Sequence, residues 1–288
     1  MKVKFILLSV MLLSFGADVL ADGGFTSDSL KVDGQYRVFR LYRPQGLAQD
    51  APLVFMLHGY GSKGEVNNLI CQTADKHKFA VCVPVGLQDP TGKHSWNVGY
   101  PMQDGWKVDD VKTMCRMARF VQKKYHLSAK NTFLSGMSNG GEMCYLLAYS
   151  NQKVFKAFGS LAGLTMQWIY KERIIPRPIP FLEIHGTSDT TSMWEGDPDN
   201  TGGWNPYIAV PLAVHAVAAA DRCEIEVRDT VVYDQTRKHR PIIRHKYLRG
   251  DQGTEVWLYE VIGAPHCWFA DDMDTGEVLW EFFSKYLE

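Results

Sequence analysis

The chain has 288 residues, of which 45% are hydrophobic and 12% aromatic, a composition that suits one large domain with a sizeable core. Its 31 lysines and arginines nearly balance 32 aspartates and glutamates, giving a net charge of −1, so no basic surface for nucleic acid is expected. Outside the N-terminal end, no run approaches the roughly 20 apolar residues that a membrane-spanning helix needs.

The N-terminus has the pattern of a secretory signal peptide. Lys2 and Lys4 precede an apolar run over residues 5–15, and the residues at 19–21 suit cleavage. We therefore expect a signal peptide over residues 1–21 and one folded domain over residues 22–288, exported to the periplasm or secreted. Six cysteines would remain, so disulfides are permitted, but their spacing does not select a pairing. No cysteine and histidine spacing indicates a metal site.

The first half of the expected domain begins with a hairpin over residues 29–32 and 36–42, around the tight-turn pair Asp33-Gly34. The elements that follow are a buried strand at 53–57, a helix at 66–78, a strand at 80–84, an irregular stretch at 86–106 and a helix at 109–125. Asp109 and Asp110 are expected to cap the start of this last helix.

The second half repeats the alternation of strands and helices. Its expected elements are strands at 132–134, 155–162 and 179–184, a loop at 190–206, a helix at 207–220, a hairpin at 224–232 and 242–247, a strand at 255–261 and a helix at 277–287. Continuous apolar strands between amphipathic helices predict an α/β fold, in which a mixed, mostly parallel sheet carries helices on both faces.

Residues 133–141 carry the most specific motif, a G-x-S-x-G sequence around Ser138 between an apolar strand and a helix-forming segment. That order is typical of a nucleophile elbow, a sharp turn that exposes one serine hydroxyl above a sheet. Gly136 and Gly140 suit such a turn, because residues without a Cβ let strand and helix approach closely. The alternative is an ordinary glycine-rich turn.

A serine nucleophile needs a histidine to accept its proton and an acid to orient that histidine. Asp189 follows the expected strand at 179–184, and His266 follows the strand at 255–261, so both come after Ser138 in the order that the elbow requires. The alternatives are that Asp189 only stabilises a turn and that His266 is structural. His185 ends a strand but precedes Asp189, and we expect it to be structural.

An oxyanion hole is the remaining component of acyl-transfer chemistry, because negative charge builds on the substrate oxygen during attack. One donor is expected to be the backbone N–H of Asn139, directly after the serine. We assign the second to the backbone N–H of Tyr60, in the glycine-flanked loop after the strand at 53–57. His58 is expected to brace that loop through hydrogen bonds of its ring.

Four motifs, LHGYGS, SGMSNGG, EIHGTSD and GAPHCW, together resemble the secreted α/β-hydrolase esterases that include feruloyl esterases and polyhydroxybutyrate depolymerases, and are similar to acetylxylan esterases. The resemblance covers nearly all of residues 22–288. It implies an α/β-hydrolase catalytic domain with Ser138 as nucleophile, Asp189 as acid and His266 as base. Cys267 departs from the family pattern, and a Cys223–Cys267 bridge that fixes the histidine loop is left open.

Four tryptophans fall in loops expected near the serine, and a phenolic acyl group or a sugar ring can stack on such side chains. The resemblance implies that Trp268, two residues after the histidine, lies on the leaving-group side. We expect Trp268, Trp204 and Trp96 to contact substrate, while Trp194 is a weaker candidate. The alternative for each is a structural role.

The sequence therefore predicts a serine carboxylic-ester hydrolase that needs no metal or organic cofactor. The expected substrate is feruloylated or acetylated plant cell-wall polysaccharide, with ferulate favoured over acetate. The alternatives are a polyester depolymerase, a peptidase on the same fold and, least favoured, a non-catalytic carbohydrate-binding protein. The absence of an evident surface-binding domain or linker in the sequence disfavours the depolymerase.

Overall fold

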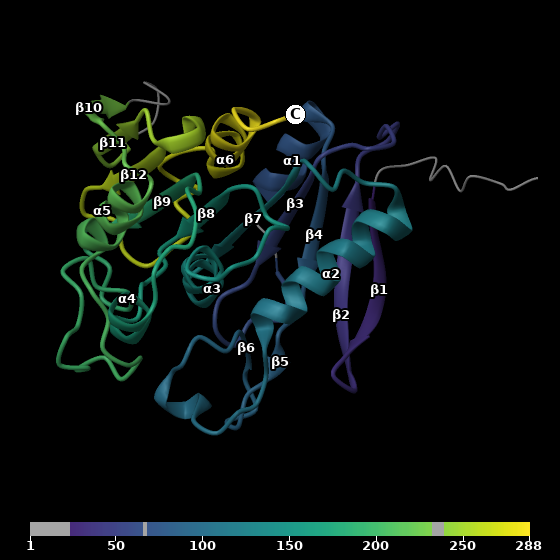
Figure 1. The fold of residues 1–288 in the computed structure, drawn as a ribbon, viewed down its shortest axis with the longest axis horizontal. Helices are drawn as coiled ribbons and strands as arrows, with labels where there is room; N and C mark the ends of the chain where they lie inside the picture. Colours follow the sequence, from purple (N-terminus) through teal and green to yellow (C-terminus); the bar gives the residue numbers. More distant parts are fainter. Residues whose placement is uncertain (1–23, 66–67, 232–238) are drawn as a thin grey trace, which may run out of the picture.

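The computed structural model describes residues 24–65, 68–231 and 239–288. The expected signal peptide and the turn of the hairpin after residue 231 lie outside the described residues. Ten strands form one large sheet (Figure 1). In spatial order they are β1 (Gly24–Val32), β2 (Gln35–Arg43), β4 (Ala80–Pro84), β3 (Leu53–Leu57), β7 (Thr132–Met137), β8 (Phe158–Leu161), β9 (Phe181–Gly186), β12 (Val256–Val261), β11 (Ile242–Leu248) and β10 (Ile225–Val231).

The centre of this sheet is parallel and its edges are antiparallel. Strands β4, β3, β7, β8, β9 and β12 pair in parallel with one another, in that order. Antiparallel pairing adds β1 and β2 at one edge and β11 and β10 at the other. The prediction of a mixed, mostly parallel sheet is therefore confirmed, as are both hairpins.

The helices cover both faces of the sheet (Figure 1). In β3, Phe55 faces one hydrophobic core while Val54 and Met56 face the other, because successive side chains of a strand point to opposite faces. The first core also takes side chains from α2 (Asp110–Tyr125), α3 (Asn139–Ala148) and α5 (Val210–Ala220). The second takes them from α1 (Asn68–His77) and α6 (Thr275–Ser284).

The start of α2 confirms one expected cap and corrects the other. The Asp109 side chain accepts a hydrogen bond from the backbone N–H of Lys112, 2.8 Å away, as an N-cap does. Asp110 instead forms a buried ion pair with Arg37, with 2.6 Å between the guanidinium nitrogen and the carboxylate oxygen. The prediction that Asp110 caps the helix is wrong because its carboxylate is turned into the protein toward β2.

The start of one helix and several short elements differ from the sequence prediction. Helix α5 begins at Val210 rather than 207, because Tyr207 forms β-bridges with Met166 and Asp197. The stretch 86–106 holds a small hairpin of β5 (Leu87–Gln88) and β6 (His94–Ser95), followed by the 3₁₀ turn η1 (Pro101–Gln103). The short helix α4 (Gln167–Glu172) was not expected, and a second 3₁₀ turn, η2 (Asp251–Gly253), precedes β12.

No helix within the described ranges is long and apolar enough to cross a membrane.

Candidate active site

Ser138 sits at the turn between β7 and α3, with backbone angles of φ 57° and ψ −121°. A positive φ is unusual for serine and marks a strained turn. A Cβ added to Gly136 would lie 2.5 Å from the carbonyl carbon of Gly140, and one added to Gly140 would lie 2.5 Å from the carbonyl oxygen of Leu57. Strand and helix therefore meet through glycine backbone on both sides of Ser138, which is the strand–turn–helix geometry expected from the motif.

Asp189 and His266 lie in contact after neighbouring strands β9 and β12. His266 Nδ1 is 2.7 Å from Asp189 Oδ2, so the ring donates a hydrogen bond to the carboxylate and its Nε2 is left for another partner. The other oxygen, Oδ1, accepts hydrogen bonds from the backbone N–H groups of Thr191 and Ser192, at 2.8 and 2.7 Å. Asp189 is buried, whereas one fifth of the His266 side chain is exposed.

Ser138 and His266 line the same pocket, which has a volume of about 410 Å³. The pocket also contains two of the three tryptophans expected to touch substrate, Trp204 and Trp268, together with Tyr60. Its remaining lining residues are Gly59, Ser62, Glu65, Met137 and Thr191. The structure thus brings together residues from loops after β3, β7, β9 and β12 with the segment that contains Trp204.

The loop after β3 passes directly beside Ser138. A Cβ added to Gly59 would lie 3.3 Å from Ser138 Cβ. His58 holds this loop through both ring nitrogens: Nδ1 donates to the Gly59 carbonyl over 2.8 Å, and Nε2 accepts from the Gly86 N–H over 2.9 Å. Burial lowers the pKa of His58, which favours the neutral ring that these two bonds require. His58 has the bracing role expected for it.

Trp96 is not available to a substrate. Its side chain is fully buried, with 0% exposed, and its indole N–H donates to the carbonyl oxygen of His58 over 2.9 Å. The prediction that Trp96 contacts substrate is therefore wrong. Its position in an irregular segment suggested exposure, but the indole points into the core rather than toward the pocket.

The same tryptophan holds the first residue of α3. The Asn139 side chain accepts from the Trp96 backbone N–H through Oδ1, at 2.7 Å, and donates to the Trp96 carbonyl through Nδ2, at 3.1 Å. The Asn139 backbone N–H lies at the helix start, where amide donors have no partner within the helix. Trp96 thus links the two backbone segments that carry the expected oxyanion donors.

Glu142 and Tyr100 form a buried pair behind this link that sequence reasoning missed. The Tyr100 hydroxyl donates to Glu142 Oε2, and Asn139 Nδ2 lies 3.4 Å from the same oxygen. Burial raises the pKa of the Glu142 carboxyl from 4.5 to about 7. The Tyr100 ring lies 5.1 Å from that of Trp204 and 5.9 Å from that of Tyr60, so the pair also supports the pocket wall. The position of Glu142 within the otherwise uncharged helix α3 was the sequence signal that could have indicated a buried partner.

His185 braces the loop that carries Asp189, as expected. Its Nδ1 lies 3.0 Å from Glu183 Oε1, and its Nε2 donates to the Ser192 carbonyl over 2.7 Å. Glu183, His185, Asp189 and Ser192 are all buried. His185 Nε2 lies 3.7 Å from Asp189 Oδ2. Burial alone would lower the pKa of His185, but the contact with Glu183 outweighs it and the pKa is raised.

All six cysteines are free, so the Cys223–Cys267 bridge left open by the sequence is not formed. Within the described part of the chain, no group of three or more histidine, cysteine, aspartate or glutamate side chains is placed to hold a metal ion.

A serine raised between a parallel strand and a helix, followed along the chain by an aspartate and a histidine that meet after later strands, defines the α/β-hydrolase fold. The chain belongs to the Esterase family, described as "Putative esterase", whose sequence pattern matches residues 31–274.

Two curated relatives share part of the sequence. A bifunctional acetylxylan esterase/xylanase of Neocallimastix patriciarum is 28% identical over 166 residues, covering 57% of this chain and 23% of the relative. Feruloyl esterase B of Piromyces equi is 28% identical over 160 residues, covering 53% of this chain and 29% of the relative. The matches thus span less than a third of each relative's length.

Solved structures share the fold at low sequence identity. The acetyl xylan esterase from Aspergillus awamori superposes with a TM-score of 0.60 at 14% identity, covering 90% of this chain and 99% of that one. An S-formylglutathione hydrolase from Agrobacterium tumefaciens gives a TM-score of 0.57 at 12% identity, covering 93% and 97%.

Proposed function

We propose that the chain is a carboxylic ester hydrolase that works through a catalytic triad of Ser138, His266 and Asp189. The observation that carries the proposal is the 2.7 Å contact of His266 Nδ1 with Asp189, made by a histidine that lines the same pocket as Ser138. With Nδ1 donating to the carboxylate, Nε2 takes the serine proton as the hydroxyl attacks the ester carbonyl. It returns that proton to the leaving alcohol, and then activates water to release the acid from the acyl-enzyme.

The negative oxygen of the tetrahedral intermediate is proposed to bind the backbone N–H groups of Tyr60 and Asn139. Asn139 begins α3, so its amide lies at the positive end of the helix dipole. The glycine-flanked loop of Tyr60 lies against Ser138, which supports the second donor. The chemistry in this proposal uses side chains and backbone amides of the chain and needs no metal or organic cofactor.

The proposed substrates are esters on plant cell-wall polysaccharide, with ferulate and acetate as the acyl groups. The names of the two curated relatives support this class. The pocket volume of about 410 Å³ and the half-buried rings of Trp204 and Trp268 suit an aromatic acyl group or a sugar beside the ester. We also propose that residues 1–21 direct export and are removed.

The test is release of ferulate from methyl ferulate and of acetate from 4-nitrophenyl acetate by the chain from residue 22. Ser138→Ala is expected to reduce both by several orders of magnitude, because the nucleophile is lost. Ser284→Ala, at the end of α6 and outside the pocket, is the matched control. Hydrolysis that persists in folded Ser138→Ala protein would refute the mechanism. Release of acetate by the wild-type protein without release of ferulate would restrict the acyl group to acetyl.

A further inference from the structure

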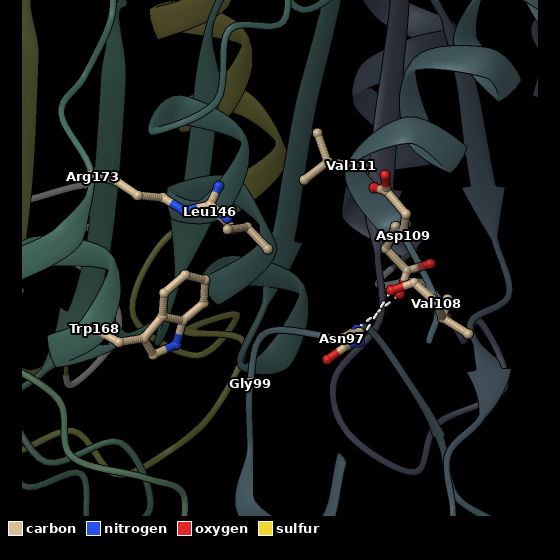
Figure 2. Close-up of a pocket in the computed structure, with 9 residues that line it drawn as sticks. Asn97, Gly99, Val108, Asp109, Val111, Leu146, Trp168 and Arg173 are labelled. Atoms are coloured by element: carbon tan, nitrogen blue, oxygen red, sulfur yellow. Dashed lines mark hydrogen bonds between the residues drawn. The ribbon is translucent and has the colours of Figure 1, made fainter. Parts of the chain in front are cut away.

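A second pocket, of about 480 Å³, opens on the face of the molecule formed by α2, α3 and α4 (Figure 2). Its walls come from the segment before α2, from Leu146 of α3, and from Trp168 and Arg173 of the α4 region. None of the proposed triad or oxyanion residues lines it. The proposed esterase mechanism makes no use of this pocket.

Trp168 and Arg173 form one wall. The indole N–H of Trp168 donates to the Val98 carbonyl over 3.2 Å, and a Cβ added to Gly99 would lie 2.8 Å from the same nitrogen, so the backbone fixes the ring edge. The Arg173 guanidinium carbon lies 5.0 Å from the centroid of the ring. Arg173 is exposed and forms no ion pair with any residue that the structure describes.

Asn97 and Asp109 form the opposite wall. Asn97 Nδ2 donates to the carbonyls of Trp106 and Val108, at 2.9 and 3.1 Å, which fixes the orientation of the amide. Its oxygen therefore points away from these carbonyls, toward the side of Gly99 and Trp168 (Figure 2). Asp109 is exposed, and one of its carboxylate oxygens, Oδ1, caps α2, while the other makes no hydrogen bond within the part of the chain that the structure describes.

We infer that this pocket binds a neutral sugar unit. A pyranose presents an apolar C–H face and a rim of hydroxyls that both donate and accept hydrogen bonds. The pocket pairs an indole ring and the Leu146 side chain with an amide oxygen, a carboxylate and a guanidinium, which match those two properties. Asp110 also lines the pocket, but its carboxylate is buried and paired with Arg37. The exposed charges are therefore one carboxylate and one guanidinium on opposite walls, and the pocket offers no excess of charge to a charged ligand.

Contacts between the walls of the two pockets support the view that the sugar is part of the proposed substrate. Asn205 Nδ2 donates to the carbonyl of Gly99, which lines the second pocket, over 2.7 Å. The residue before Asn205 is Trp204, which lines the catalytic pocket and packs on Tyr100. The segment of Trp204 and Asn205 thus contacts residues of both pockets, and a polysaccharide whose ester lies at Ser138 is proposed to place a further unit here. This inference rests on the proposed function.

Binding is tested by calorimetric titration of the full domain with xylohexaose, a neutral oligosaccharide without ester groups. Trp168→Ala and Arg173→Ala are each expected to weaken binding about tenfold, by loss of the ring contact or of the guanidinium donors. Tyr170→Ala is the control, because Tyr170 is exposed on the same helix but outside the pocket. Unchanged affinity in folded Trp168→Ala and Arg173→Ala proteins overturns the inference, as does binding only of uronic-acid oligosaccharides.

Kinetics separate this inference from the proposed function. The two variants are expected to lower kcat/KM on acetylated xylan about tenfold, through KM, and to leave kcat/KM on 4-nitrophenyl acetate unchanged. An equal loss on both substrates would mean a structural role and overturn the inference. A wild-type protein that binds xylohexaose through Trp168 but hydrolyses no ester would retain the sugar pocket and refute the proposed esterase mechanism.

Discussion

The Asn139 side chain forms two hydrogen bonds with the backbone of Trp96: it accepts from the Trp96 N–H and donates to the Trp96 carbonyl. The Trp96 indole adds a third bond, to the carbonyl of His58. Trp96 therefore connects α3 to the loop after β3, through its backbone on one side and its indole on the other. Because the proposed oxyanion donors lie on these two segments, their spacing depends on Trp96.

Trp96→Phe is expected to lower kcat about tenfold with little change in KM. The ring still fills the core, but the His58 carbonyl loses its donor and the Tyr60 loop is less firmly held, which affects the transition state more than substrate binding. The measurement is steady-state kinetics on 4-nitrophenyl acetate.

Trp257→Phe is the control for this prediction, since Trp257 is also buried and the change removes the hydrogen bond of its indole to Glu255, away from the pocket. The two variants are compared at equal folded fraction by near-ultraviolet circular dichroism. A similar fall in kcat in both would contradict a specific role for Trp96.

Asp189→Asn is expected to reduce kcat by about 10⁴-fold while the loop keeps its conformation. The asparagine side chain keeps one oxygen that accepts from the backbone N–H groups of Thr191 and Ser192. It places an uncharged NH₂ group where the second carboxylate oxygen accepted from His266 Nδ1. Asp197→Asn is the control, because Asp197 also accepts backbone N–H groups, those of Thr201 and Gly202. If Asp197→Asn lost activity and Asp189→Asn kept it, the acid would be wrongly assigned.

Glu142→Gln is expected to change the pH dependence of stability. The pKa of Glu142 is about 7 in the folded protein and ordinarily 4.5, so the folded state binds more protons between these values and loses stability as pH rises. The difference in free energy of unfolding between variant and wild type should therefore shift by about 3 kcal/mol in favour of the variant from pH 4 to pH 8. Urea unfolding at the two pH values measures it; parallel pH profiles would count against a raised pKa.

Gly136→Ala is expected to destabilise the fold by about 1–3 kcal/mol and to abolish activity, because the new Cβ would meet the backbone of Gly140 at 2.5 Å. The strand–helix contact has no flexible side chain that could move aside. Gly24→Ala is the control, since a Cβ at Gly24 has no atom within 4 Å. Thermal unfolding of both variants, with activity, tests whether this contact sets the elbow; equal melting temperatures would show that it does not.

The sequence was sufficient for features that depend on local pattern. Apolar runs placed the central strands, and the glycines around Ser138 predicted the turn, since both follow from backbone geometry over a few residues. The contact between Asp189 and His266 also follows from the pattern, because parallel strands end at one edge of the sheet and residues after β9 and β12 meet there.

What the sequence could not give depends on the direction of side chains and on distant pairs. Trp96 and Trp204 both lie in irregular segments, yet one is buried and the other lines the pocket, a difference set by packing. The contact of Tyr100 with Glu142 joins a loop to a helix 42 residues later, which no local pattern encodes. Helix α4 has six residues, too few for a clear period.

Asp189 and His266 are 77 residues apart in the chain, and their contact depends on β12 pairing beside β9. A chain in which β3, β7 and β8 have already paired therefore holds Ser138 at its turn but lacks a base beside it. Recovery of hydrolysis during refolding would then require the addition of β12 beside β9. The rate at which activity returns would therefore measure the rate at which β12 pairs with β9.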